Sequence, residues 1–108
     1  MKLDFTNKTV LITGASRGIE KRIADDFESL NAEVVGISST DFDLSNKDSI
    51  NNFCQKISEY DKIDICINNA GINLIDSIDN IKKEDFNTIL TINLYAPFLI
   101  SQTVSSIM

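Results

Sequence analysis

The residues most suited to chemistry form a short loop, Thr13–Glu20, whose sequence is TGASRGIE. Gly14 would permit a tight turn after the preceding apolar run, and Gly18 would let backbone approach a ligand. Because a helical pattern follows, free N–H groups and the helix dipole would face an anion such as a pyrophosphate. The Gly-x-x-x-Gly spacing matches neither the G-x-G-x-x-G form nor a P-loop. An ordinary strand-to-helix turn is therefore the alternative to a phosphate-binding loop.

The elements that must position this loop alternate between strand and helix patterns. Short apolar runs predict strands at Lys8–Thr13, Glu33–Ile37 and Ile63–Asn68, and the sequence DFDL, residues 41–44, predicts a very short further strand. This alternation predicts an α/β fold, with a parallel sheet, helices on its faces and right-handed crossovers. No crossover helix fits between Ile37 and residue 41, so the DFDL strand would be vestigial or only loosely paired.

Helical patterns fill the intervals between these strands and follow the last of them. Ser45 and Asp48 form a capping-box-like pair that would begin the second helix. The third pattern runs from Lys82 almost to the end of the chain, and Pro97 is expected to break or kink it around Asn93–Pro97. The first two helices would bury faces made of Ile19, Ile23, Phe27 and Leu30, and of Ile50, Phe53, Cys54 and Ile57.

Composition argues against several classes of function. The 108 residues suit one domain, and their net charge of −6, with no run of Lys and Arg longer than two, argues against nucleic acid or an anionic membrane as a partner. The chain has no histidine, which excludes Ser-His and Cys-His nucleophilic machinery. Cys54 and Cys66 lie in apolar patterns and read as small buried hydrophobes. The polar N-terminus and the lack of a long apolar run predict a cytoplasmic chain.

Three further motifs lie where an open α/β sheet binds ligands. NNAG, Asn68–Gly71, ends a predicted strand, DFDLS, residues 41–45, follows the second strand, and Asn93 lies in a long apolar helix. In this order and at these separations, the motifs and the glycine loop together resemble the N-terminal part of the short-chain dehydrogenase/reductase family, in particular 3-oxoacyl thioester reductases. The resemblance covers the whole chain, but family members are commonly more than twice this length.

The resemblance implies a fold, a reaction and a site. The fold would be a Rossmann-like doubly wound parallel sheet truncated after about four strands, with residues 1–108 forming an incomplete dinucleotide-binding portion of a single domain. The reaction would be hydride transfer between NAD(P) and a small-molecule carbonyl or alcohol. Asn93 matches the family's catalytic asparagine, which positions a lysine through a water. The residues implied to bind the cofactor are Gly14, Ser16, Arg17, Gly18, Ile19, Ser38, Asp43, Leu44, Asn69, Ala70 and Gly71.

The sequence favours NADP over NAD as that cofactor. NAD enzymes often carry an acid at the end of the second strand for the ribose hydroxyls, but Ser38 and Ser39 stand at this place. Arg17 would be able to pair with a 2′-phosphate. Asp41 lies close enough in sequence to keep NAD as the alternative.

Glu20 departs from the family pattern, which has a third glycine at this position. A glutamate would add volume where the helix packs on the strand, at a cost of about 1–3 kcal/mol, or would set a carboxylate near the pyrophosphate. The alternative is a solvated acid in the first helical turn, which the helix dipole favours. In that case Lys21 and Arg22 would be able to screen its charge.

The family's proton donor, a tyrosine followed four residues later by lysine, is a second departure. Tyr60 is followed four residues later by Asp64, and Tyr95 by Leu99, so neither matches the donor. The 108-residue chain is therefore expected not to catalyse the family reaction. The apolar helix within residues 94–108 would self-associate or pair with a homologue.

Three hypotheses remain open from the sequence. The first is a shortened, inactive oxidoreductase, and the second is a non-catalytic dinucleotide-binding or regulatory module that pairs with a full-length homologue. The third is an unrelated flavodoxin-like or receiver-like domain, which would require clustered acids at the strand ends, where Asn68 and Asn69 stand instead.

Overall fold

The computed structural model describes residues 3–14, 18–37, 42–72 and 76–108. The described part of the chain alternates strands and helices as the sequence predicts. The elements are β1 (Thr9–Thr13), α1 (Gly18–Ser29), β2 (Glu33–Ile37), α2 (Lys47–Ile57), β3 (Ile65–Ile67), α3 (Lys83–Leu90), a π-helical turn (Thr91–Tyr95) and α4 (Ala96–Ser105).

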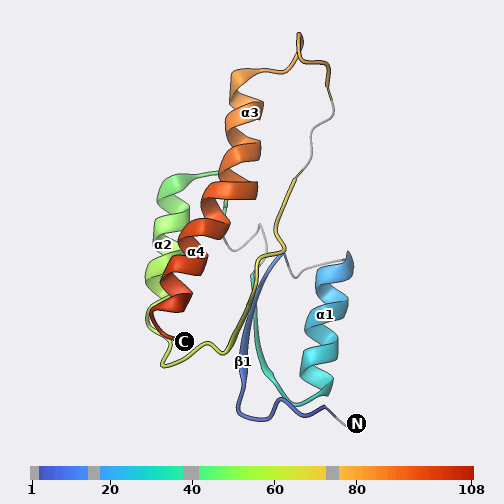
Figure 1. Ribbon diagram of the computed structural model, residues 1–108, viewed down its shortest axis with the longest axis vertical. Coiled ribbons are helices and arrows are strands. Elements are labelled where there is room, and N and C mark those ends of the chain that lie inside the picture. The colour runs from blue at the N-terminus through green and yellow to red at the C-terminus, as the bar shows by residue number, and fades with distance from the viewer. Residues whose placement is uncertain (1–2, 15–17, 38–41, 73–75) are drawn as a thin grey trace.

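The strands form a parallel sheet in the order β2-β1-β3 (Figure 1). In the register of this sheet, Leu11 at the centre of β1 lies between Val35 and Cys66. The described residues form three strands rather than about four, because residues 42–44 pair with no strand. Phe42 and Leu44 pack instead on the apolar core beside α2. The described residues 42–46 therefore lead directly into α2.

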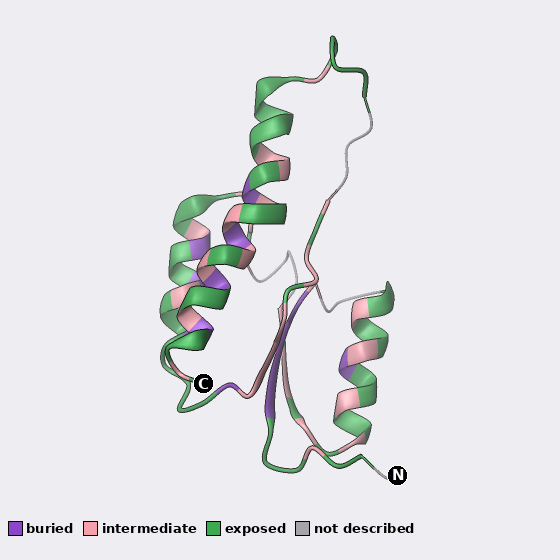
Figure 2. Ribbon diagram, in the orientation of Figure 1, coloured by how far each residue is buried: buried purple, intermediate pink, exposed green. Residues whose placement is uncertain are grey.

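Helices cover both faces of the sheet, which confirms the doubly wound arrangement (Figure 1). On one face, α1 packs through Ala24 on Val10 and Ile12. On the other face, α2 and α4 pack on Leu11, and the buried residues of these helices face inward (Figure 2). This second core holds Ile50, Phe53, Ile57, Ile63, Ala96, Ile100 and Val104. Because side chains alternate along a strand, β1 supplies both cores.

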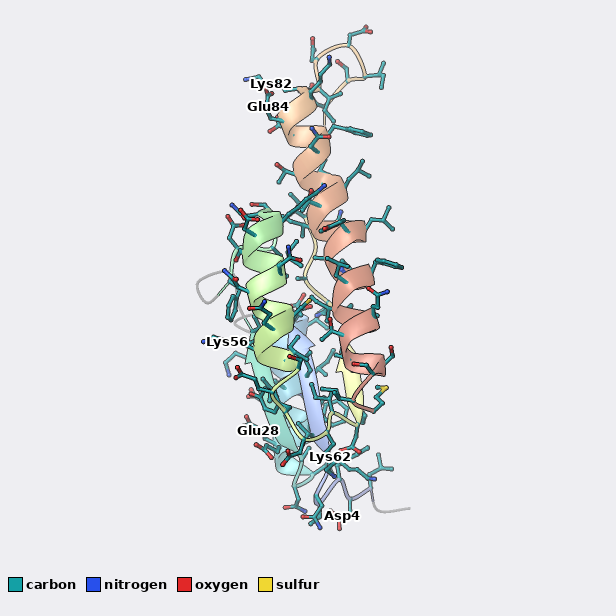
Figure 3. All side chains as sticks on the ribbon, turned by 90° about the vertical axis from the view of Figure 1, so that its left-hand side faces the viewer. Asp4, Glu28, Lys56, Lys62, Lys82 and Glu84 are labelled. Carbon is teal, nitrogen blue, oxygen red and sulfur yellow. The ribbon has the colours of Figure 1, made fainter. Side chains whose placement is uncertain are left out.

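The long C-terminal helical region is continuous from Lys83 to Ser105. Its expected irregularity is present, but as a π-helical turn in which the Ala96 N–H donates to the Thr91 carbonyl. Pro97 follows this turn near the start of α4, and its ring nitrogen has no hydrogen to donate to a carbonyl one turn earlier. The α3 end of this region, near Lys82 and Glu84, projects past α2 (Figure 3).

Two helix starts differ in detail from the sequence-based prediction. Asn46 rather than Ser45 caps α2, because the Asn46 side chain accepts hydrogen bonds from the N–H groups of Asp48 and Ser49. Ile19 does not join the buried face of α1, since 74% of its surface is exposed.

Among the described residues, no helix is both long enough and apolar enough to span a bilayer.

Candidate functional site

The ends of all three strands meet at Gly14, the first glycine of the predicted loop. The Gly14 N–H donates to the carbonyl of Ile37, the last residue of β2, at 2.6 Å. A Cβ placed on Gly14 would lie 3.2 Å from the Cα of Ala70, just after β3. Gly14 also has a φ of 75°, a conformation that side-chain-bearing residues rarely adopt. Glycine is therefore required here both by conformation and by the close approach of backbone.

Thr13 joins the same strand ends through its side chain, a role that sequence reasoning missed. Its hydroxyl oxygen accepts hydrogen bonds from the N–H groups of Asn69 and Ala70, each at 3.0 Å. Thr13 is 1% exposed, so water does not compete for these bonds. The available signal was a β-branched hydroxyl residue at the last position of a buried strand, directly before the glycine loop.

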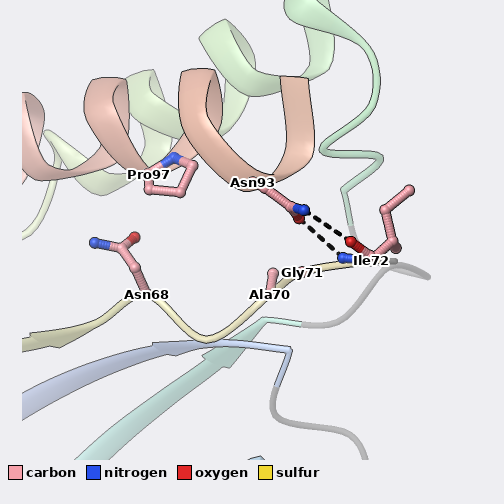
Figure 4. A pocket seen from close by; sticks show the side chains of 6 residues that line it. All are labelled: Asn68, Ala70, Gly71, Ile72, Asn93 and Pro97. Carbon is pink, nitrogen blue, oxygen red and sulfur yellow. Dashed lines mark hydrogen bonds between the residues drawn. The ribbon is translucent and has the colours of Figure 1, made fainter. Parts of the chain in front are cut away.

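Asn93 holds the next part of the loop after β3 (Figure 4). Its Oδ1 accepts a hydrogen bond from the Ile72 N–H at 2.9 Å, and its Nδ2 donates to the Ile72 carbonyl at 2.7 Å. A Cβ on Gly71 would lie 3.3 Å from Asn93 Oδ1, so a glycine leaves room for this contact. The Asn93 side chain, which extends from the π-helical turn, thus holds the loop in position.

An open surface hollow of about 530 Å³ lies between this loop and the start of α4 (Figure 4). Asn68 is one of the residues that line this hollow, and its Nδ2 donates a hydrogen bond to the Ser101 hydroxyl at 2.9 Å. The Nδ2 atom of the neighbouring Asn69 is buried without a hydrogen-bond partner among the described residues. Such a group is costly unless a ligand or water satisfies it. The lining residues are Asn68, Ala70, Gly71, Ile72, Asn93 and Pro97.

Asp43 and Leu44 lie in the turn that leads into α2. The Asp43 carboxylate accepts hydrogen bonds from the hydroxyl and the N–H of Ser45, and these two bonds, in that order, hold the pKa of Asp43 below its usual range. The Asp43 N–H donates to the hydroxyl of Ser49. Leu44 packs on the core, so its side chain serves the fold. Asp43 is a charged carboxylate at neutral pH and accepts hydrogen bonds only.

The second glycine, Gly18, begins α1 with a φ of 70°. Ile19 beside it is an exposed apolar side chain at the N-terminal end of this helix. The other predicted cofactor contacts, Ser16, Arg17 and Ser38, lie outside the described residues. The structure therefore brings Gly14 into direct contact with Asn69 and Ala70. Gly71, in the adjoining loop, lies beside the Asn93 side chain of the π-helical turn.

The remaining polar and sulfur groups of the described residues form no metal site. In residues 3–14, 18–37, 42–72 and 76–108, no three Cys, Asp or Glu side chains are grouped to hold an ion. Cys54 and Cys66 are free thiols that are partly buried against the core of α2 and α4. Burial raises the pKa of the Cys66 thiol, which keeps it protonated and unreactive.

Sequence comparison finds reductases among the curated relatives of the chain. The chain is 30% identical to the 3-oxoacyl-(acyl-carrier-protein) reductase FabG of Escherichia coli K12, over 121 aligned positions that take in 94% of this chain and 50% of the relative. It is 34% identical to the Rickettsia typhi reductase of the same name, over 93% of this chain and 48% of the relative. The chain therefore spans about half the length of the curated relatives it matches.

Structure comparison gives the same fold. A ligand-free aldohexose dehydrogenase of Thermoplasma acidophilum superposes with a TM-score of 0.84 at 28% identity, covering 96% of this chain and 45% of that one. A Beutenbergia cavernae protein assigned as an NAD(P)-dependent gluconate 5-dehydrogenase, solved with NADP at low occupancy, superposes with a TM-score of 0.91 at 22% identity. It covers the whole of this chain, and the match covers 51% of that protein.

The family model for short-chain dehydrogenases matches residues 30–108, which include β2, β3, the NNAG loop and Asn93. Together with the three-stranded Rossmann-like sheet and the glycine turn after β1, this match identifies the chain as a member of the short-chain dehydrogenase family.

Proposed function

We propose that residues 1–108 form the N-terminal, dinucleotide-binding portion of a single Rossmann domain in an NAD(P)-dependent oxidoreductase. The observation that carries the proposal is the meeting of strand ends around Gly14, with the buried Nδ2 of Asn69 unsatisfied next to it. In parallel α/β sheets, the carboxyl ends of the strands are where ligands bind. A polar ligand held there would supply the acceptor that Asn69 lacks.

The residues that would hold the dinucleotide are those predicted from the sequence. Backbone around Gly14 and Gly18 and the N-terminus of α1 would face the pyrophosphate, with Ser16 and Arg17 beside it. Ser38, Asp43 and Leu44 would border the adenosine half. Asn69, Ala70 and Gly71 would border the ribose and nicotinamide. When bound, the cofactor would supply hydride chemistry on a small-molecule carbonyl or alcohol.

NADP is the proposed cofactor, with NAD as the alternative. Two observations support this choice: no acid stands at Ser38 or Ser39 after β2, and Arg17 lies in the loop as a partner for a 2′-phosphate. The fold match to a protein solved with NADP agrees with this choice but identifies the fold alone.

Asn93 would act as a positioning residue in this site. Both the Oδ1 and the Nδ2 atoms of its side-chain amide bond the Ile72 backbone, which fixes the loop beside the hollow. The proton donor of the reaction is not supplied by Tyr60 or Tyr95, since neither is followed four residues later by lysine. We therefore propose that the 108-residue chain alone binds the dinucleotide without turnover.

Titration of the purified chain with NADPH and with NADH, followed by nucleotide fluorescence or calorimetry, tests the proposal. Saturable binding is expected, tighter for NADPH than for NADH, with no oxidation of NADPH by a 3-oxoacyl thioester. Circular dichroism would establish that the sample is folded. A folded chain that binds neither dinucleotide up to millimolar concentrations would contradict the proposal.

A second function, that of a non-catalytic module that self-associates or pairs with a homologue, is favoured by one surface. Phe86, Leu90, Leu94 and Phe98 are large apolar side chains, each 40–66% exposed, spaced four residues apart along the continuous helical region. Such a row is typical of an interaction surface. Light scattering of the purified chain tests it: a Leu94→Glu variant should be monomeric where the parent chain associates, and a monomeric parent chain would exclude self-association.

A further inference from the structure

Glu20 lies at the glycine loop with its carboxylate folded back toward the start of its own helix. Glu20 Oε2 is 3.2 Å from the position that a Cβ on Gly18 would occupy. Gly18 is the first residue of α1, and the start of α1 lies at the same height as the carboxyl end of β1 in Figure 1. The Glu20 carboxylate therefore lies at the N-terminal end of α1, where the helix attracts negative charge.

The packing of α1 on the sheet does not involve Glu20. The helix packs on β1 through Ala24, with Ile23 and Phe27 beside it, and Glu20 is only half-buried. The added volume of a glutamate in place of glycine is thus directed away from the apolar cluster. The consequence of having glutamate rather than glycine at position 20 is therefore a negative charge beside Gly18, not a steric conflict with the sheet.

The neighbouring described cations do not neutralise this charge. Lys21 forms an ion pair with Asp25 at 3.0 Å, and Arg22 forms one with Asp26 at 3.1 Å. Both pairs point one turn toward the C-terminal end of the helix. Arg17, the remaining cation of the loop, lies outside the described residues.

We propose that Glu20 is an internal anion that competes with a ligand phosphate for the N-terminus of α1 and thereby sets the affinity of the glycine loop. A phosphate that reaches the Gly18 N–H meets a like charge, so binding requires the carboxylate to rotate away. The ligand class concerned is a pyrophosphate, free or within a dinucleotide. In the dinucleotide form, the inference rests on the function proposed above, and inorganic pyrophosphate tests it separately.

Two substitutions separate the charge of Glu20 from its size. Glu20→Gln keeps the volume and removes the charge, whereas Glu20→Gly removes both. Glu28→Gln is the matched control, because it removes an exposed carboxylate from the last turn of the same helix. The probes are inorganic pyrophosphate, followed through the Gly18 amide resonance, and NADPH, followed by fluorescence.

Pyrophosphate should bind about tenfold or more tightly to Glu20→Gln than to the parent chain, with Glu28→Gln within twofold of the parent. Because the penalty is electrostatic, the advantage should shrink as salt is raised from 0.01 M to 1 M. NADPH should follow the same order. Equal pyrophosphate binding by the parent and Glu20→Gln, with or without tighter binding by Glu20→Gly, would overturn the inference. Tighter pyrophosphate binding by Glu20→Gln with no NADPH binding by any variant would sustain the inference and reject the proposed function.

Discussion

Asn93 and Ile72, 21 residues apart in sequence, are joined by a pair of hydrogen bonds in which the side-chain amide of Asn93 both accepts from and donates to the Ile72 backbone. The pair connects the π-helical turn to the loop that follows β3 (Figure 4). A five-residue π-helical turn places Asn93 on this side of the helical region, and such turns often occur at functional sites.

Asn93→Ala should lower the free energy of unfolding by about 1 kcal/mol, because both hydrogen bonds are lost at an exposed site. Urea denaturation would measure this difference. Hydrogen exchange of the Ile72 amide should also accelerate, which reports the bond directly. Asn51→Ala, at an exposed position of α2, is the control for the gain in helix propensity and should not change Ile72 exchange.

Gly14→Ala should destabilise the chain by about 1–3 kcal/mol, because alanine is strained at a φ of 75° and its Cβ would crowd the Ala70 backbone. Thermal or urea unfolding would give the value. Gly36→Ala, in the middle of β2, serves as the control, since Gly36 is not among the glycines with positive φ in the described residues. Equal stability of the two variants would contradict the geometry of this turn.

Thr13→Val should destabilise the chain by about 2 kcal/mol or more, since it leaves the Asn69 and Ala70 N–H groups without their acceptor. Thr13→Ser, which keeps the hydroxyl, should retain most of the stability. Thr9→Val is a matched control on the same face of β1, also buried. If Thr9→Val lowered the free energy of unfolding as much as Thr13→Val does, the hydrogen bonds of the Thr13 hydroxyl would not be the cause of the destabilisation.

Asp64 should make the stability depend on pH. Its carboxylate accepts a hydrogen bond from the Thr9 N–H at 2.8 Å and lies 3.3 Å from the Lys62 ammonium group, and these contacts, in that order, lower the pKa of Asp64 below the ordinary 3.8. A lowered folded-state pKa stabilises the fold above the unfolded-state value and ceases to do so as pH falls through the folded-state value.

Asp64→Asn should therefore be less stable than the parent chain at pH 7, and the difference should narrow as pH falls below 3.8. Urea denaturation across this range would measure it. Asp61→Asn, which removes an exposed charge from the same loop, controls for the change in net charge. If the difference in unfolding free energy between Asp64→Asn and the parent chain were the same at pH 3 as at pH 7, the lowered pKa of Asp64 would not be its cause.

The sequence predicts the parts of this structure that depend on local patterns. β2 has the predicted bounds, Glu33–Ile37, and the glycine turn follows β1 where the spacing of Gly14 and Gly18 places it. The predicted irregularity near Asn93 is also present. These features follow from hydrophobic periodicity and from residues whose backbone preferences are strong, and both are visible in a single chain.

The contacts that depend on tertiary placement were not predictable from the sequence. Nothing local distinguishes Ser45 from Asn46 as the cap of α2, and the choice follows from how the preceding turn folds. The apolar character of Ile19 suggested burial, but this second residue of α1 is 74% exposed. The acceptor role of Thr13 depends on which strand ends lie adjacent in the sheet.

The position of β1 between its two partners has a consequence for the order in which the chain acquires structure during synthesis. Once Ile37 has left the ribosome, β1 can pair with β2 and close the cluster of Val10, Ile12 and Ala24. The core on the other face of the sheet, which contains Leu11, is complete only when α4 has been synthesised, because Ile100 and Val104 belong to that core. Until α4 has been added, α2 alone covers this face of the nascent sheet, and a chaperone would find its binding surface on the apolar part that is still uncovered.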